Sequence, residues 1–269
     1  MSMIPYGFSY RRAKSVKDAE ALLAAAQDAK LLAGGQTLIA AMKMRLANPS
    51  ALIDIGGIEE LRFIRAEGNR IVIGAGTRHA EVASSFDVKK SIPALAALAG
   101  SIGDPAVRHM GTLGGSLANN DPAADYPAAV LALDATVRTN KRQIRAGDFF
   151  TGMFATALDE REIVTEVSFP VPERAGYAKF ANPASRYAMA GVFVAKAGPV
   201  VRVAVTGAAP CVFRVPAMEA ALAKDFSPDA LAGVEIDPAE MNSDLHGSAQ
   251  YRAHLTAVMA RRAVEAALK

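Results

Sequence analysis

Two pairs of adjacent glycines are the residues of this sequence most suited to binding chemistry. The first is Gly34-Gly35 in "LLAGGQTL" (31–38), where a short apolar run ends and a helical pattern begins. Backbone N–H groups at such a junction have no intrahelical partner, and the helix dipole adds partial positive charge. The turn could therefore bind phosphate without Lys or Arg. Gln36 and Thr37 supply further donors, although an isolated Gly-Gly pair is more often a plain tight turn.

The second pair repeats this arrangement in "GTLGGSLANNDPAAD" (111–125), where Thr112 precedes Gly114-Gly115 and Ser116 follows. Two such turns could hold the two phosphates of a dinucleotide. The usual dinucleotide fingerprint GxGxxG is missing, since Gly74-Ala75-Gly76 is followed by His79 where the last glycine should stand. The sequence therefore predicts a dinucleotide site on a fold that is not a Rossmann fold.

Composition narrows the class of protein. The 269 residues are 51% hydrophobic and 21% charged, which is typical of a folded domain. A net charge of +3 and 6% aromatic residues argue against a nucleic-acid partner. No segment is apolar enough to predict a membrane span, and no leader sequence is evident, so we expect a cytoplasmic protein.

Metal and cluster ligands are scarce. Cys211 is the single cysteine, so this chain is not expected to hold an iron–sulfur cluster or a cysteine zinc site. The four histidines show no ligand spacing, and we predict no metal site. His79 and His109 have no recognisable nucleophile beside them, so both are expected to be structural or to lie beside a ligand, and no residue is assigned a catalytic role.

The elements that must position these residues alternate between helix and strand. Helices are expected over 15–30, 37–46, 94–102, 125–135 and 249–269, and strands over 30–35, 51–55, 69–76 and 135–139. Two further strands are expected to meet at Ala197-Gly198-Pro199. Pro170, Pro172 and Gly176 suit neither a helix nor a sheet interior and predict a boundary between a larger and a smaller part.

The order and spacing of these motifs resemble a known family. "LLAGGQTL", "LIDI" (52–55), "IGAGTRHAEV" (73–82), "IGDPAVRHMGTLGGSLANNDPAAD" (102–125) and the closing "SDLHGSAQYRAHLTAVMARRAV" are similar to the FAD-binding medium subunit of the molybdenum hydroxylases, the xanthine dehydrogenase and aerobic carbon monoxide dehydrogenase family. The resemblance implies an α+β protein. Residues 1–172 would form an FAD-binding fold of two subdomains, of the p-cresol methylhydroxylase (PCMH) type. Residues 173–269 would form a small α+β domain with three or four antiparallel strands.

The resemblance also implies which residues bind FAD. Around the diphosphate it places Leu31, Leu32, Ala33, Gly34, Gly35, Gln36, Thr37, Leu38, Thr112, Leu113, Gly114, Gly115 and Ser116. Asn119 is a further polar candidate. Asp125 matches an acidic residue that accepts hydrogen bonds from ribityl or ribose hydroxyls; from the sequence alone it could instead cap the helix after it.

Four more positions carry implied roles near the flavin ring. Ile102 and Val164 would press apolar surface or backbone against the cofactor, but ordinary core packing explains both equally well. Lys179 matches a lysine that stabilises the anionic reduced ring; the alternative is a solvated lysine at a strand start. Tyr187 would lie near the isoalloxazine, or be a half-buried core tyrosine.

The implied activity is electron transfer in a complex. A large partner would hold the molybdenum cofactor and a small partner two [2Fe–2S] clusters, assembled as a dimer of heterotrimers; electrons would pass to this FAD and on to an external acceptor. Gln36 stands where some relatives of the fold carry a histidine bonded to flavin, so we expect non-covalent FAD. Two alternatives remain: a stand-alone reductase of the same fold, and a non-enzymatic nucleotide-binding module.

Overall fold

The N-terminal unit is a small parallel sheet. The structure is a computed structural model that describes residues 3–269. Strands β1 (Ser9–Arg12), β2 (Ala29–Leu32) and β3 (Ala51–Asp54) pair in the order β1-β3-β2. Helix α1 (Val16–Ala25) begins at Ser15, whose hydroxyl accepts from the Asp18 amide as the sequence predicts. Helix α2 (Leu38–Lys43) follows β2 and is shorter than expected.

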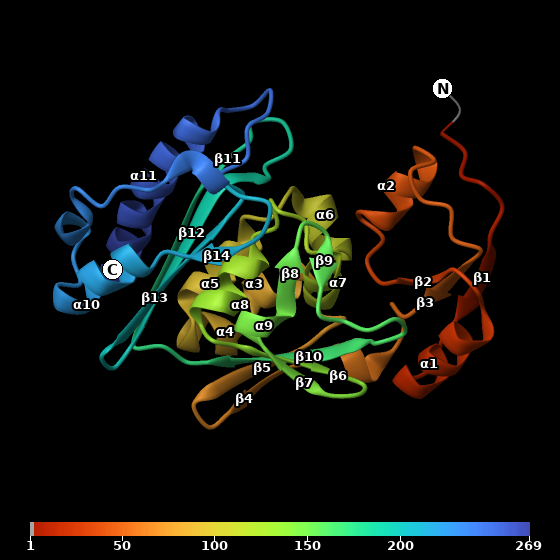
Figure 1. Cartoon of the computed structure of the whole chain (residues 1–269). Coiled ribbons are helices and arrows are strands. Elements are labelled where there is room, and N and C mark those ends of the chain that lie inside the picture. Colours follow the sequence, from red (N-terminus) through yellow and green to blue (C-terminus); the bar gives the residue numbers. More distant parts are fainter. Residues whose placement is uncertain (1–2) are drawn as a thin grey trace.

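The middle of the chain builds an antiparallel sheet covered by helices (Figure 1). Its strands are β4 (Ile64–Glu67), β5 (Arg70–Gly74), β6 (Thr136–Thr139), β7 (Gln143–Arg145) and β10 (Val164–Pro170), in the order β4-β5-β10-β6-β7. The helices are α3 (His79–Ser84), α4 (Phe86–Ser91), α5 (Pro93–Gly100), α6 (Pro105–Met110), α7 (Leu113–Asn119), α8 (Tyr126–Ala132) and α9 (Ala146–Phe149). Short strands β8 (Phe150–Gly152) and β9 (Ala155–Thr156) form a separate hairpin, and a 3₁₀ turn, η1, spans Glu59–Leu61.

The C-terminal part is a four-stranded antiparallel sheet, within the range that the resemblance implied. It contains β11 (Arg174–Ala181), β12 (Ala188–Ala197), β13 (Val200–Thr206) and β14 (Phe213–Arg214), in that order. The turn between β12 and β13 falls at Gly198, as predicted. Helices α10 (Pro216–Lys224) and α11 (Ala249–Leu268) pack on this sheet, with 3₁₀ turns η2 (Pro228–Leu231) and η3 (Pro238–Glu240) between them.

One hydrophobic core continues from the middle of the chain into the C-terminal sheet. Phe193 and Ala195 of β12 and Ala204 of β13 belong to the same buried cluster as Ile71 of β5 and Tyr126 of α8. The opposite face of the sheet, with Val192 and Val194, packs on α11. The four-stranded sheet is therefore sandwiched between α11 and the central helices (Figure 1).

One expectation about local structure is wrong. The second glycine pair follows helix α6, and Gly114 and Gly115 lie in the first turn of α7. Gly176 does not break the sheet, because it lies inside β11. A Cβ at Gly176 would stand 1.9 Å from the carbonyl oxygen of Ala263, so glycine here permits close packing of α11. Among the described residues, no helix is long and apolar enough to cross a membrane.

Candidate functional site: a cleft beside the first glycine loop

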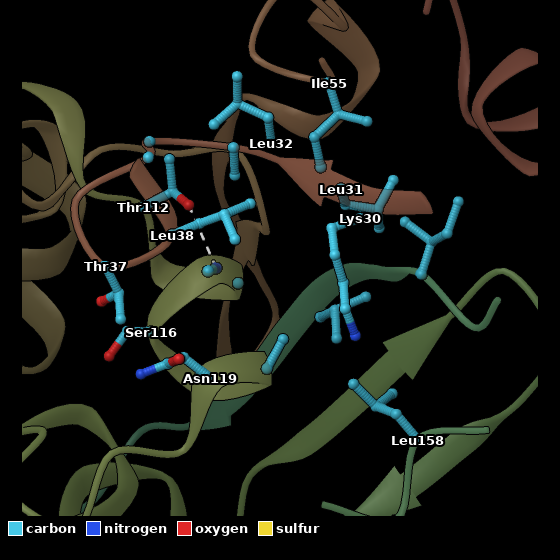
Figure 2. A pocket seen from close by; sticks show the side chains of 18 of the residues that line it. Lys30, Leu31, Leu32, Thr37, Leu38, Ile55, Thr112, Ser116, Asn119 and Leu158 are labelled. Atoms are coloured by element: carbon cyan, nitrogen blue, oxygen red, sulfur yellow. Dashed lines mark hydrogen bonds between the residues drawn. The ribbon is translucent and has the colours of Figure 1, made fainter. Parts of the chain in front are cut away.

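A cleft of about 810 Å³ separates the N-terminal unit from the middle of the chain. One wall is β2 with the first glycine loop, which we define as residues 33–37. The facing wall is α7 together with the chain from Thr156 to Val164 (Figure 2). A cavity of this volume falls in the range of small-molecule and cofactor sites.

Most of the predicted binding residues line this cleft. They are Leu31, Leu32, Ala33, Gly34, Gly35, Gln36, Thr37, Leu38, Thr112, Gly114, Gly115, Ser116, Asn119, Val164 and Tyr187. The fold thus brings the two glycine pairs, far apart in the sequence, to opposite sides of one cavity. Leu113, Ile102, Asp125 and Lys179 do not line it.

The first glycine loop presents free backbone donors to the cleft. Among the described residues, none accepts a hydrogen bond from the amides of residues 34–37. Gly35 adopts φ +69°, the left-handed region in which a side chain is strained. A Cβ at Gly34 would lie 2.2 Å from the carbonyl oxygen of Met110, so this glycine is required by the chain itself. Successive unpaired amides in a turn suit an anion such as a diphosphate.

The second glycine segment, residues 112–116, differs because its four amides from Leu113 to Ser116 all have partners. The amides of Leu113 and Gly114 donate to the carbonyl oxygens of Thr77 (3.0 Å) and Ala75 (2.8 Å). Those of Gly115 and Ser116 donate to the side chain (3.2 Å) and the carbonyl oxygen (3.0 Å) of Thr112. The reason given from the sequence, unpaired amides at both glycine pairs, therefore fails at the second. Its contribution to the cleft has to come from side chains.

Polar side chains supply that contribution at one end of the cleft. Thr37 from the loop faces Ser116 and Asn119 of α7, and the three side chains lie toward the same end of the view in Figure 2. Thr112 points to the amide of Gly115 instead and caps α7. Together with the loop amides, these groups offer hydrogen-bond donors and acceptors to a phosphate and to sugar hydroxyls.

Asp125 and Lys179 form a buried ion pair behind the cleft. The Lys179 Nζ lies 2.9 Å from Asp125 Oδ1, and the two side chains are 8% and 3% exposed. The Tyr177 hydroxyl donates to the same oxygen (2.5 Å), and Lys179 also donates to the Ser101 carbonyl oxygen (3.0 Å). Burial raises the pKa of the Asp125 carboxyl, while the Lys179 ammonium and the Tyr177 hydroxyl oppose that rise.

This ion pair rules out the two alternatives that the sequence left open, helix capping by Asp125 and a solvated Lys179. Asp125 stands at the N-cap of α8, but its side chain makes no capping bond. Lys179 is not a solvated lysine, because its ammonium is buried and paired. Neither side chain faces the cleft directly, so any influence on a bound ring would pass through the cleft wall.

The remaining predicted residues divide between core and cleft. Leu113 is fully buried in the core, and Ile102 packs on that core while its carbonyl oxygen accepts from Arg108 (2.9 Å). Val164 is buried yet lines the cleft, so packing and contact with a ligand are both open to it. Tyr187 lines the cleft and is 47% exposed. Partial burial, and then the carboxylates of Asp121 and Asp125, raise the pKa of its hydroxyl.

Sequence reasoning did not include Lys30 among the binding residues and gave His79 no specific role, yet both line the cleft. Lys30 is an exposed side chain of β2 that reaches into the cleft opposite Leu158 (Figure 2). Its signal was a cation inside the otherwise apolar run "AKLLAGG". His79, treated only as structural or ligand-adjacent, lines the cleft from the start of α3. Within residues 3–269 no cluster of three or more His, Cys, Asp or Glu side chains could hold a metal.

Comparison with known proteins identifies the family. Residues 6–172 match the model described as the FAD-binding domain in molybdopterin dehydrogenase. The carbon monoxide dehydrogenase medium chain of Hydrogenophaga pseudoflava is 39% identical, over 98% of this chain and 98% of that protein. The nicotine 6-hydroxylase medium subunit of Paenarthrobacter nicotinovorans is 38% identical over 95% of each.

Solved structures agree with this match. Reconstituted CO dehydrogenase from Oligotropha carboxidovorans superimposes with a TM-score of 0.89 at 34% identity, covering 98% of both chains. The chain therefore belongs to the FAD-binding medium subunits of the molybdenum hydroxylase family. The family prediction, the α+β fold, the FAD-binding domain and the assignment as an oxidoreductase are confirmed.

Proposed function

We propose that this chain is the electron-transfer subunit of a molybdenum-containing hydroxylase or dehydrogenase complex. It would receive two electrons per turnover from [2Fe–2S] clusters in a small partner and pass them to an external acceptor. A large partner would hold the molybdenum cofactor and oxidise the substrate. The names of the relatives, medium chains or subunits of CO dehydrogenase and nicotine 6-hydroxylase, support this division of labour.

The observation that carries the proposal is the first glycine loop in the wall of the cleft. Its unpaired amides at residues 34–37 fit the diphosphate of FAD, which needs hydrogen-bond donors. Ser116 and Asn119 across the cleft would add hydrogen bonds. Gln36 is an exposed residue of the loop and carries an unreactive amide, which supports non-covalent binding at this position.

The flavin, once bound, supplies all of the redox chemistry, and the chain's residues position it and adjust its surroundings. Tyr187 lines the cleft near the Asp125–Lys179 pair, and we assign the ring end of the cofactor to this part of the cavity. Because the pair carries no net charge, Lys179 would act on the ring as an oriented dipole with Asp125.

Further features of the assembly belong to the same proposal. Cys211 is the only thiol of the sequence, and three further cysteines at least would be needed to hold a cluster in this chain. We therefore place both clusters in a partner. We further propose that the complex is a dimer of heterotrimers and that it lies in the cytoplasm. Residues 1–172 are assigned to FAD binding and residues 173–269 to a C-terminal domain that supports the cleft.

The experiment has two stages. Purified chain should show flavin absorbance, and acid precipitation should release the yellow cofactor into the supernatant. A complex assembled without flavin should still show bleaching of its iron–sulfur absorbance by substrate, while turnover with the physiological acceptor is lost. Substrate oxidation by the isolated chain would contradict the proposal and favour a stand-alone reductase. Protein that never binds flavin would favour a nucleotide-binding module.

A further inference from the structure

His79 is a buried polar side chain in the cleft wall that lacks a partner. The residue is 5% exposed, yet it is one of the residues that line the cleft. Its ring nitrogen Nδ1 is completely buried and has no hydrogen-bond partner within residues 3–269. Leaving such a group unpaired in the interior costs roughly 1–3 kcal/mol, so we expect Nδ1 to find a partner within the wall, which leaves Nε2 as the nitrogen available to the cavity.

The imidazole lies directly behind the first glycine loop. The His79 amide donates to the carbonyl oxygen of Gly111 (3.0 Å). A Cβ at Gly111 would stand 2.6 Å from His79 Nε2, so a bare glycine leaves room for the ring. On the other side, a Cβ at Gly34 would lie 2.8 Å from Gly111 Cα. Gly111 therefore contacts both His79 Nε2 and the first glycine loop, and all three belong to the same wall of the cleft.

The His79 imidazole is neutral and therefore has only one N–H group to donate. Burial, with a smaller contribution from Arg108, lowers the pKa of His79 to about 4, so the ring is neutral at pH 7. Tyr126, whose ring centroid lies 5.4 Å from that of His79, also has a buried hydroxyl for which the described residues offer no partner. Burial raises the pKa of that hydroxyl, so it keeps its proton and can donate.

We propose that His79 is a further FAD-binding residue, which donates a hydrogen bond from Nε2–H to a diphosphate oxygen held by the first glycine loop. The Tyr126 hydroxyl turns toward Nδ1 and makes it the acceptor nitrogen, which places the proton on Nε2. Tyr126 is thus a positioning residue and His79 a cofactor ligand. This inference rests on the FAD site proposed above.

Two substitutions and a matched control test the contact. His79→Leu removes the donor, and His79→Gln keeps an N–H group at similar reach. The control is His109→Gln, because His109 is exposed, lies outside the cleft and bonds only to the Pro105 carbonyl oxygen (2.7 Å). Dissociation constants of FAD, ADP and riboflavin are measured by titration of deflavinated full-length chain, with circular dichroism to verify folding.

His79→Leu should weaken both FAD and ADP roughly tenfold or more, as expected for a hydrogen bond to a charged group, and leave riboflavin unchanged. His79→Gln should recover most of the affinity, and His109→Gln should match wild type. Equal loss for FAD and riboflavin, without loss for ADP, would overturn the diphosphate contact in favour of the ribityl chain. Unchanged FAD affinity in folded His79→Leu would also overturn it, whereas wild type that binds no FAD would overturn the proposed function instead.

A second measurement does not depend on the variants. In ¹⁵N-labelled wild type, the His79 ring should show the Nε2–H tautomer at pH 7, and its Nε2 resonance should shift when FAD binds. Tyr126→Phe should increase the population of the other tautomer while the fold is retained. An Nδ1–H tautomer in wild type, or a resonance insensitive to FAD, would refute the assignment.

Discussion

The two glycine pairs look alike in the sequence and behave differently in the fold. In the first glycine loop, the amides of residues 34–37 are without partners in the described structure. In the second glycine segment, the amides of residues 113–116 are all paired with the chain's own oxygens. The segment also leads into Asp125, which is itself tied to Lys179 and Tyr177. We call the first glycine loop the open wall of the cleft, because its amides are available to a ligand. We call residues 113–116 the closed wall, because their amides are already bonded within the chain.

The difference teaches that adjacent glycines at the start of a helix serve two purposes. At Gly35 the glycine is needed for a left-handed backbone that turns amides outward. At Gly114 it is needed because a Cβ would stand 2.5 Å from the Cβ of Ala75. Substitutions in the first region should therefore act mainly on ligand binding, and substitutions in the second mainly on stability.

The largest effect on stability is expected from breaking the Lys179–Asp125 ion pair, which follows the closed wall. Lys179→Met leaves the Asp125 carboxylate buried without its cation, which costs roughly 3–5 kcal/mol in comparable buried pairs. Chemical denaturation of the flavin-free chain measures this loss. Adding Asp125→Asn should restore part of the stability, because the uncompensated charge is removed. Lys90→Met, at an exposed position in α4, is the control; an equal loss there would mean that the ion pair is not the cause.

Hydrogen exchange compares the two regions in one sample. FAD at about 100 times its dissociation constant should slow exchange in residues 33–37 by up to about 100-fold, equivalent to about 2.7 kcal/mol of linkage. Residues 113–116 should exchange slowly before FAD is added and change little, because their amides are already bonded. Equal protection of both regions on binding would remove the distinction between an open and a closed wall.

A smaller effect is expected from an added methyl group in the closed wall. Gly114→Ala forces a Cβ against Ala75 and should lower the free energy of unfolding by roughly 1–3 kcal/mol. Gly147→Ala is the matched control, since Gly147 is exposed and a Cβ there would meet no atom within 4 Å. Thermal unfolding of the flavin-free proteins tests the pair. A stable Gly114→Ala protein that has lost FAD would instead show that this glycine serves the ligand.

The smallest effect comes from two threonines in equivalent positions. Thr112→Val removes the hydroxyl that caps α7 and should cost about 1 kcal/mol of stability. Thr37 stands at the N-cap of α2 without a capping bond, so Thr37→Val should alter stability by less than about 0.5 kcal/mol. FAD affinity should respond in the opposite order, with Thr37→Val the weaker binder. If Thr37→Val lost more stability and Thr112→Val lost more FAD affinity, the assignment of the two walls would be wrong.

Local patterns in the sequence predicted the elements well where one rule dominates. Ser15 begins α1, and Gly198 joins β12 to β13, because capping and turn formation depend on neighbouring residues. Most of the residues that the resemblance assigned to the cofactor do meet in the cleft. Their position there tests the geometry of the site, while their contacts with FAD stay predictions.

Contacts between distant segments escaped the sequence. Nothing near Gly114 shows that its amide donates to Ala75, or that Gly176 is needed for the approach of Ala263 in α11. The pairing of Lys179 with Asp125 likewise joins residues far apart in the chain, and each alone looked solvated or capping. His79 gave no local sign of its position, since its burial depends on Gly111 and Tyr126.

The shared core has a consequence for anyone who exchanges parts between relatives. The match to the FAD-binding domain ends at residue 172, which suggests a natural place to cut. Yet Phe193, Ala195 and Ala204 beyond that point fill the same core as Ile71 and Tyr126. Lys179, also beyond residue 172, forms an ion pair with Asp125 before it. A chimera joined at residue 172 would take one half of this core and one member of the ion pair from each parent, and the two halves would not be matched to each other. Grafts should therefore carry Asp125, Tyr177 and Lys179 together with both faces of that core.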